Sequence, residues 1–402
     1  MRSITLPSMM PFEEKNNWHI LDVGSTWMQE FASAMAHRVP TIAWAPRMLK
    51  LGMLQNWQRP EHVLNPQLNI ERFPLQRGYA RAPINWLVPF ERRLLARLKA
   101  ASRDPSSSPL ICSTPYYAPV AERWPGPVIY YATDLTMAYP SADPRQVVRL
   151  DQRLCKVATA VCPNSQRIAS YFVQQAGCDP GKITVVPNAT RASNVASAPL
   201  LAPGPLPNDL KHLKRPIAGV IGNLSANMDW LLLADTIRRT PQVTWVFVGP
   251  TTMPIEDRQQ SAARDLVKPR AVFVGLKTYD QLQDYARCFD VAVLPYRKHE
   301  PTYSGSSTRF YEHQAACRPI IATRGFAELL EKPPLLTLVD TSIQLCDAIS
   351  NLAAVAFNDG FETARWQASR TGTWEERARA IVETVIPAPV PEPALLHAVA
   401  VH

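Results

Sequence analysis

Residues 291–323 read VAVLPYRKHEPTYSGSSTRFYEHQAACRPIIAT. The first four residues form an apolar run of strand length, and residues 320–322 form a second such run. Between them, a polar loop up to position 307 leads into a segment over 308–316 with the apolar spacing of a helix. A strand, a helix and a second strand in this order are typical of parallel sheets that helices cover on both faces. This stretch therefore predicts an α/β fold.

The same alternation of strands and helices occurs along most of the chain. Before position 196, the predicted strands cover 19–23, 41–44, 110–113, 128–131, 159–162 and 183–186, and the predicted helices cover 27–38 and 165–175. After position 216, the predicted strands cover 217–221, 243–248, 272–274, 291–294 and 320–322, and the predicted helices cover 230–238, 279–287 and 308–316. Two such series predict two doubly wound, Rossmann-like domains.

Prolines mark the boundaries of these domains. Prolines at 199, 203, 205, 207 and 216 exclude a helix or a central strand over 196–216, which is therefore the predicted interdomain linker. We expect a first domain over 1–195, a second over 217–375, a closing helix over 376–386 and a disordered, proline-rich tail over 387–402. Because ligands bind outside the carboxyl ends of the strands in such folds, the two domains are expected to face each other across a cleft.

Composition excludes several classes of protein. The 402 residues are 46% hydrophobic and 19% charged, which is enough for sizeable cores and excludes wholesale disorder. There is no run of 18 apolar residues to span a membrane, and no apolar leader precedes the charges at 13–15. Seven cysteines without a CxxC pair favour a reduced, cytoplasmic chain, with the inner membrane face as a further location.

The positive charge lies in the first half of the chain. Residues 1–200 hold 22 Lys and Arg against 13 Asp and Glu, whereas residues 201–402 hold 21 against 21. Eight of the basic residues lie in one region: Arg72, Arg77, Arg81, Arg92, Arg93, Arg97, Lys99 and Arg103. Interleaved apolar residues allow two interpretations: an amphipathic face resting on acidic lipid, or a domain helix with its apolar stripe in the core.

The densest polar cluster follows the predicted strand 291–294. Ser306 and Ser307 lie where the next helix begins, a position at which backbone N–H groups can bind an anion. Arg309 adds a fixed positive charge that suits a phosphate, and Glu312, three residues on, could accept hydrogen bonds from vicinal hydroxyls. The alternative is an ordinary helix start with an Arg309–Glu312 ion pair on the surface.

Further candidates follow other predicted strands. Gly222 and Asn223 form a turn in which the backbone could approach a ligand, and Tyr296 could stack on a base or a sugar. Asp134 follows the strand 128–131 and is the first candidate for a general base, with Asp22 second. The alternatives are that Asp134 caps a turn and that Asp22 lies within its strand.

Several stretches of the chain resemble GT-B glycosyltransferases of the family-4-like and xanthan glucuronosyltransferase-like groups. They include SSTRFYEHQAACRPIIAT (306–323), ITVVPNATR (183–191) and STPYYAPVAERWPGPVIYYATD (113–134), in the order and spacing of those families. The resemblance implies that the second domain binds a nucleoside-diphosphate sugar and the first a hydroxyl acceptor, plausibly a lipid-linked or surface-polysaccharide saccharide. The resemblance assigns Asp134 as the general base, and it assigns Arg309 to assisting the departure of the diphosphate.

The sequence also departs from the family pattern. Retaining members often carry two glutamates eight positions apart, but Ser304 stands eight positions before Glu312, which favours an inverting transfer over a retaining one. No DxD or histidine cluster occurs, so no metal or other cofactor is expected. A retaining family-4-like transferase that acts on a natural product or a protein stays an alternative, as does a sugar-nucleotide-binding subunit without catalysis. A nucleic-acid binder is disfavoured, because interleaved aromatic residues and zinc spacing are missing.

Overall fold

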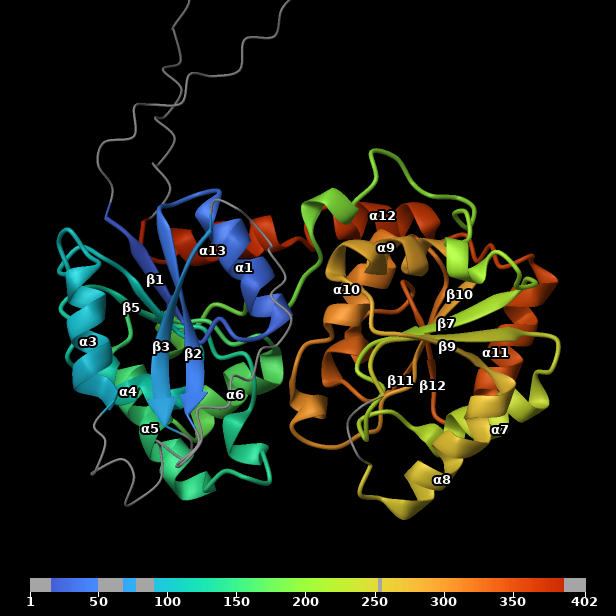
Figure 1. Ribbon diagram of the computed structural model, residues 1–402, viewed down its shortest axis with the longest axis horizontal. Coiled ribbons are helices and arrows are strands. Elements are labelled where there is room, and N and C mark those ends of the chain that lie inside the picture. The colour runs from blue at the N-terminus through green and yellow to red at the C-terminus, as the bar shows by residue number, and fades with distance from the viewer. Residues whose placement is uncertain (1–15, 50–67, 77–89, 252–254, 387–402) are drawn as a thin grey trace, which may run out of the picture.

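The computed structural model describes residues 16–49, 68–76, 90–251 and 255–386. Two domains lie side by side, and each contains a six-stranded sheet with helices against both faces (Figure 1). Every strand pair is parallel. The predicted α/β class and GT-B architecture are therefore confirmed.

The first sheet has the strand order β3-β2-β1-β4-β5-β6. Its strands are β1 (Trp18–Leu21), β2 (Thr41–Leu49), β3 (Asn69–Gln76), β4 (Leu110–Cys112), β5 (Val128–Tyr130) and β6 (Ala160–Val161). Helix α1 (Thr26–Ala36) covers one face. The other face is covered by α3 (Phe90–Ala100), α4 (Ala118–Ala121), α5 (Pro144–Val157) and α6 (Gln166–Gln174). The central strands β1, β4 and β5 are wholly buried, which is why they read as continuous apolar runs.

The second sheet has the order β12-β11-β10-β7-β8-β9. Its strands are β7 (Ile217–Ile221), β8 (Thr244–Val248), β9 (Val272–Gly275), β10 (Val291–Leu294), β11 (Ile320–Thr323) and β12 (Thr337–Val339). The helices are α7 (Trp230–Arg239), α8 (Arg258–Val267), α9 (Tyr279–Cys288), α10 (Thr308–Ala315), α11 (Ser342–Ala354) and α12 (Glu362–Ser369). The loop from β10 to α10 leaves the carboxyl end of the sheet and reaches the first domain.

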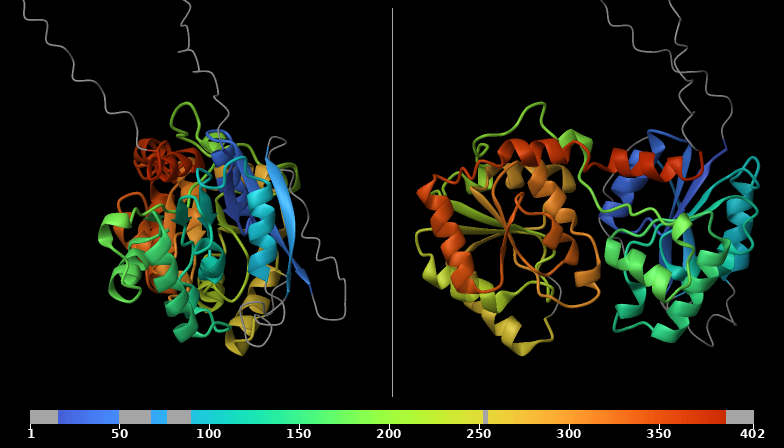
Figure 2. Two further views of the ribbon diagram at one scale, coloured as in Figure 1. Left: turned by 90° about the vertical axis from the view of Figure 1, so that its left-hand side faces the viewer. Right: turned by 180° about the vertical axis from the view of Figure 1, so that it is seen from behind.

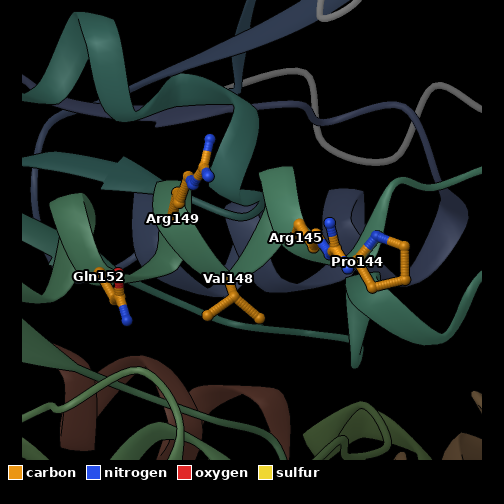
Figure 3. Close-up of a pocket in the computed structure, with 5 residues that line it drawn as sticks. All are labelled: Pro144, Arg145, Val148, Arg149 and Gln152. Carbon is orange, nitrogen blue, oxygen red and sulfur yellow. The ribbon is translucent and has the colours of Figure 1, made fainter.

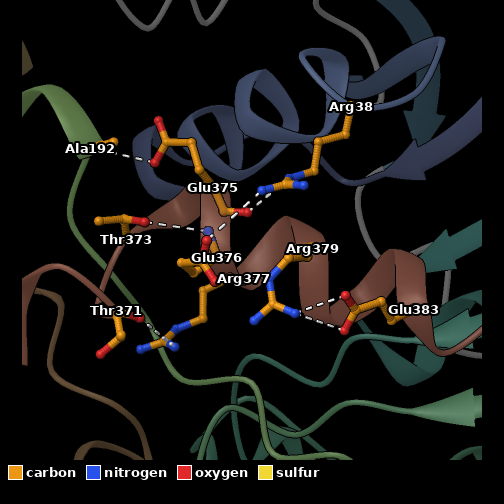
Figure 4. Close-up of polar contacts among 9 residues, drawn as sticks. All are labelled: Arg38, Ala192, Thr371, Thr373, Glu375, Glu376, Arg377, Arg379 and Glu383. Carbon is orange, nitrogen blue, oxygen red and sulfur yellow. Dashed lines mark hydrogen bonds and ion pairs between the residues drawn. The ribbon is translucent and has the colours of Figure 1, made fainter. Parts of the chain in front are cut away.

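The last helix, α13 (Trp374–Glu383), corresponds to the predicted closing helix and returns to the first domain (Figure 2). It packs on α1, and Trp374 is buried in the first domain's core. Backbone hydrogen bonds join Trp374 N to Thr190 O at 2.8 Å and Thr190 N to Gly372 O at 3.0 Å. The Arg38 side chain also donates to Glu375 O at 3.1 Å (Figure 4). The chain thus crosses between the domains twice, which limits their relative movement.

Some elements differ from the prediction. Residues 183–186 form no strand, and only a single bridge joins Ile183 to Val161. The edge strand β3 was not predicted, because Pro74 and alternating polar residues hide it, and both features are typical of sheet edges. Helices α5 and α8 were also missed, because their sequences are mostly polar. The predicted tail lies outside the described residues.

The basic region of the first domain contains α3. Its apolar residues Leu94 and Leu98 are buried in the core, while Arg92 and Arg93 are exposed. The apolar stripe of α3 therefore packs in the domain core, as the alternative interpretation has it. A contact with acidic lipid through charge alone stays a prediction. Among the described helices, none is long and apolar enough to cross a membrane.

Candidate functional site

The carboxyl ends of β7 and β10 bring together three of the predicted residues. Gly222, directly after β7, has φ +152°, a conformation that L side chains rarely adopt. A methyl group at this position would lie 3.3 Å from Tyr296 Oη and 3.9 Å from Arg309 Nε. The turn, the tyrosine and the arginine therefore line one small region of the second domain. Asn223 is exposed in the same turn.

A second glycine, which the sequence analysis did not single out, supports this turn. Gly249 follows β8 with φ +144°, and a Cβ there would lie 1.8 Å from Gly222 O. Gly249 therefore has no room for a side chain, whereas Gly222 is restricted by its φ. The pattern of a glycine directly after a buried strand, in VFVGP, was the available signal.

Arg309 and Glu312 form an ion pair one turn apart on α10. The Arg309 side chain is 25% exposed and that of Glu312 only 4%, so this is not the surface pair of the alternative interpretation. Burial acts to lower the pKa of Arg309, but the charge of and hydrogen bond to Glu312, together with the nearby Tyr296 and Tyr279, outweigh it and the pKa is raised. Arg309 is therefore a permanent cation, and part of it still reaches solvent.

Two buried polar atoms beside this ion pair lack partners. Glu312 Oε1 and the hydroxyl of Tyr279, the first residue of α9, have no hydrogen-bond partner of ordinary geometry within the described residues, although the Tyr279 hydroxyl lies against the Glu312 carboxylate. Burial, together with the nearby Glu312, raises the pKa of Tyr279 well above its usual range. Burial likewise raises the pKa of Tyr296 to about 12. Unpartnered buried groups are costly, so they suit a site that a polar ligand completes.

The serine loop is satisfied by the protein's own groups. Ser307 caps α10, accepting a hydrogen bond from Phe310 N, and its own N–H donates to Glu328 Oε2 at 3.0 Å. The hydroxyl of Ser306 accepts a hydrogen bond from Asn188 N of the first domain at 3.0 Å. The prediction that Ser307 offers a free N–H group to an anion is therefore wrong, because a glutamate already occupies that donor.

In the first domain, Asp134 lies beyond the carboxyl end of β5. The Tyr139 hydroxyl hydrogen-bonds the Asp134 carboxylate, yet burial dominates and raises its pKa to about 7. Next to it, the Asn164 side chain donates to Thr133 O. Ser165 follows directly, and its hydroxyl donates to Ser304 O of the second domain. Asp134 therefore belongs to the edge of the first sheet that meets the serine loop.

Asp22, the second candidate for the base, lies in the turn after β1 rather than within the strand. Its φ of +65° is a left-handed conformation, which aspartate tolerates better than most residues. This conformation supports a role in the turn. The position is also at the carboxyl end of the first sheet, so Asp22 shares the edge with Asp134.

A shallow hollow lies on the surface of α5. Its volume is about 400 Å³, and it is lined by Pro144, Arg145, Val148, Arg149 and Gln152 (Figure 3). None of the predicted site residues lines it. Within the described residues, no group of three His, Cys, Asp or Glu side chains is placed to hold a metal ion.

The family "Glycosyl transferases group 1" matches residues 215–354, which contain the glycine turn, Tyr296, Arg309 and Glu312. TuaH of Bacillus subtilis, named for teichuronic acid biosynthesis as a glycosyltransferase, is 20% identical over 170 residues. That match spans 42% of this chain and 42% of TuaH.

Solved structures match nearly the whole chain. HepE of Anabaena, solved with UDP and glucose, has a TM-score of 0.66 at 17% identity, over 92% of this chain and 99% of HepE. Sucrose-phosphate synthase of Thermosynechococcus elongatus has a TM-score of 0.65 at 16% identity, over 91% and 97%. At these identities the likeness shows the fold. Together, the comparisons show the GT-B fold for nearly the whole chain and a match to the family "Glycosyl transferases group 1" for its second domain.

Proposed function

We propose that the protein transfers a sugar from a nucleoside-diphosphate sugar to a saccharide hydroxyl in a single, inverting displacement without a metal. The half-buried Arg309 carries this proposal, because it lies beside Gly222 and Tyr296, and its partner Glu312 keeps one oxygen unpartnered. HepE, which shares the fold, was solved with UDP-glucose, and TuaH is named for the synthesis of a surface polymer. Both support a nucleotide-sugar donor and a polysaccharide acceptor.

Each residue has a defined role in this reaction. The acceptor oxygen forms a bond to the anomeric carbon, the bond from that carbon to the diphosphate oxygen breaks, and Asp134 takes the acceptor's proton. A carboxylate with a pKa of about 7 suits this task, since it is ionised in part at neutral pH and is a stronger base than an exposed aspartate. Arg309 stabilises the charge that develops on the departing diphosphate.

The donor is assigned to Arg309, the glycine turn at Gly222 and Gly249, and the two unpartnered oxygens. Glu312 Oε1 and the Tyr279 hydroxyl can hydrogen-bond the sugar or ribose hydroxyls. Ser306 and Ser307 then shape the loop, since both hydroxyls and the Ser307 N–H already have hydrogen-bond partners within the protein. This differs from the sequence-based assignment, which placed the phosphates on the serines.

A panel of UDP-, GDP-, TDP- and ADP-sugars tests the donor assignment through thermal unfolding. A ligand that binds only the folded state raises the apparent stability, so one nucleotide should raise the melting temperature of the wild type. Arg309→Gln should abolish the rise. Arg324→Gln is the matched control, because Arg324 pairs with Asp340 on the exposed surface of the same domain. If no sugar nucleotide stabilises the wild type, the donor assignment fails.

The stereochemistry is tested on the product. NMR of the newly formed glycosidic linkage should show an anomeric configuration opposite to that of the donor sugar. A retained configuration would exclude the single displacement and with it the role of Asp134 as the base for that step.

A further inference from the structure

The segment 187–191, PNATR, belongs to the first domain but contacts both parts of the proposed donor site in the second. Its first contact is Asn188. The Asn188 backbone N–H donates to Ser306 Oγ at 3.0 Å, and its side-chain Nδ2 donates to Ser306 O at 2.8 Å. Both residues are buried, with only 7% of each exposed. Asn188 thus holds the loop that leads into α10 and Arg309.

The second contact is Arg191. Its guanidinium pairs with Glu30 of α1 at 2.5 Å and also forms an ion pair with Asp280 in the first turn of α9. It lies 4.6 Å from the centre of the Tyr279 ring, a distance at which a cation is attracted to the ring face. Arg191 therefore fixes the start of α9, where Tyr279 lies beside Glu312.

The contacts of Asn188 and Arg191 with the second domain distinguish two states of the protein, one with the domains together and one with the domains apart. When the domains are together, the oxygens of Ser306 are paired with Asn188. If the domains separate, these bonds must be replaced by water, and Tyr279 loses the cation over its ring. A donor that needs the loop and α9 in this arrangement binds more tightly to the closed protein. By linkage, its affinity then depends on the contacts that hold the protein closed.

We propose that Asn188 and Arg191 are positioning residues that set the donor site from the opposite domain, so that sugar-nucleotide affinity depends on the first domain. This inference rests on the proposed function, because it takes the region around Arg309 as the donor site. Neither residue is assigned to touch the donor. Asn188 acts through Ser306, and Arg191 acts through Asp280 and Tyr279.

Two substitutions separate positioning from folding. Asn188→Ala removes the bond to Ser306 O, and Asp280→Asn removes the interdomain ion pair while leaving Glu30 paired with Arg191. The Asp280 side chain is 78% exposed, so this change buries no charge. Asn194→Ala is the control, because the Asn194 side chain donates to Thr190 Oγ1 within the same domain at 3.0 Å.

The first measurement is the affinity for the sugar nucleotide that stabilises the wild type, by calorimetry on the full chain. Asn188→Ala loses one buried hydrogen bond between the domains, and this loss should raise its donor Kd about tenfold. Asp280→Asn should raise it only about two- to fivefold, because its ion pair is exposed. Asn194→Ala should leave the Kd unchanged. An unchanged Kd in Asn188→Ala, or an equal loss in Asn194→Ala, would overturn the inference.

The second measurement needs no ligand. Hydrogen exchange of the free protein should be faster over residues 300–311 in Asn188→Ala than in the wild type or Asn194→Ala. If the wild type binds no sugar nucleotide, the proposed function fails, and the exchange of this loop still decides whether Asn188 positions it. Unchanged exchange over 300–311 would refute the positioning role.

Discussion

The carboxyl ends of the two sheets each carry an acidic residue, partly buried in the first domain and buried in the second, but they compensate its charge differently. In the second domain, Glu312 lies one turn from Arg309 and forms an ion pair with it. In the first domain, the groups that set the pKa of Asp134 include the Tyr139 hydroxyl but no cation. The second domain therefore holds a fixed cation, and the first holds a carboxylate that burial makes basic.

This difference separates two chemical tasks. Burial without a counter-charge favours the protonated carboxyl, so Asp134 can exchange a proton near pH 7. A cation at the same place would stabilise the ionised form and weaken the base. At the other edge, a cation without an acidic partner would lose its fixed orientation on α10. A base and a leaving-group stabiliser thus need opposite surroundings, and the two domains provide them.

Removal of the base should give the largest effect. Asp134→Asn keeps the shape of the side chain but cannot accept the proton, so kcat should fall about 10²- to 10⁴-fold. Donor affinity should be unchanged, because the donor is assigned to the other domain. Steady-state transfer assays and calorimetry measure the two quantities.

The control for this substitution is Asp143→Asn. Asp143 caps α5 in the same domain by accepting hydrogen bonds from Arg145 N and Gln146 N, and asparagine caps equally well. Its kcat should equal that of the wild type. A kcat of Asp134→Asn within a few-fold of the wild type would remove Asp134 from the chemistry.

Removal of the cation should have the next largest effect. Arg309→Gln takes away the charge on the leaving diphosphate, and the loss of one such group typically costs about 10²- to 10³-fold in kcat. Because the substitution also leaves Glu312 buried without its partner, stability should fall as well. Transfer assays and thermal unfolding follow both effects.

The double variant Arg309→Gln, Glu312→Gln separates these two causes. It contains no unpaired buried charge, so its stability should recover towards that of the wild type. Its activity should not recover. A double variant with near wild-type activity would show that Arg309 serves only to neutralise Glu312.

The sequence predicted the elements and the positions that flank them well. The apolar runs at 217–221 and 291–294 became β7 and β10 with unchanged bounds, because fully buried parallel strands leave an unambiguous pattern. Gly222 and Arg309, each placed next to a predicted strand or helix, lie together in the structure. The local sequence pattern, together with the rule that ligands bind at the carboxyl ends of parallel strands, was sufficient to place these residues in the site.

Contacts between residues that are far apart in the sequence could not be predicted from the local pattern. Asn188 and Ser306 are 118 residues apart, and Tyr279 reaches Glu312 from a different helix. Such contacts depend on how folded elements pack against each other, within a domain or between the two domains, which periodicity does not encode. The capture of Ser307 N by Glu328 has the same origin, because Glu328 lies beyond the next strand. The sequence showed that serines begin a helix, but not which acceptor would satisfy them.

A smaller change tests the hydrogen bond at Asp134 itself. The Tyr139 hydroxyl stabilises the ionised carboxylate and so holds its pKa below the value that burial alone would give. In Tyr139→Phe the pKa should rise, and the acid limb of the kcat/KM profile should move from about pH 7 to higher pH. Activity well above the limb should change little. An acid limb that stays in place, or moves to lower pH, would show that Tyr139 does not tune the base.

The smallest expected effect concerns stability. Because the pKa of folded Asp134 lies above its unfolded value, its contribution to stability is fully present at low pH and is lost as the pH rises through about 7. Asp134→Asn cannot ionise, so its melting temperature should gain on that of the wild type between pH 5 and pH 8. The variant for comparison is Glu312→Gln, which removes a carboxylate whose charge Arg309 compensates in the folded protein. Parallel unfolding curves of both variants at the two pH values would measure the contrast directly. If Asp134→Asn lost stability relative to the wild type on going to pH 8, the carboxylate would have to be compensated by a cation, and the difference between the two sheet edges would disappear.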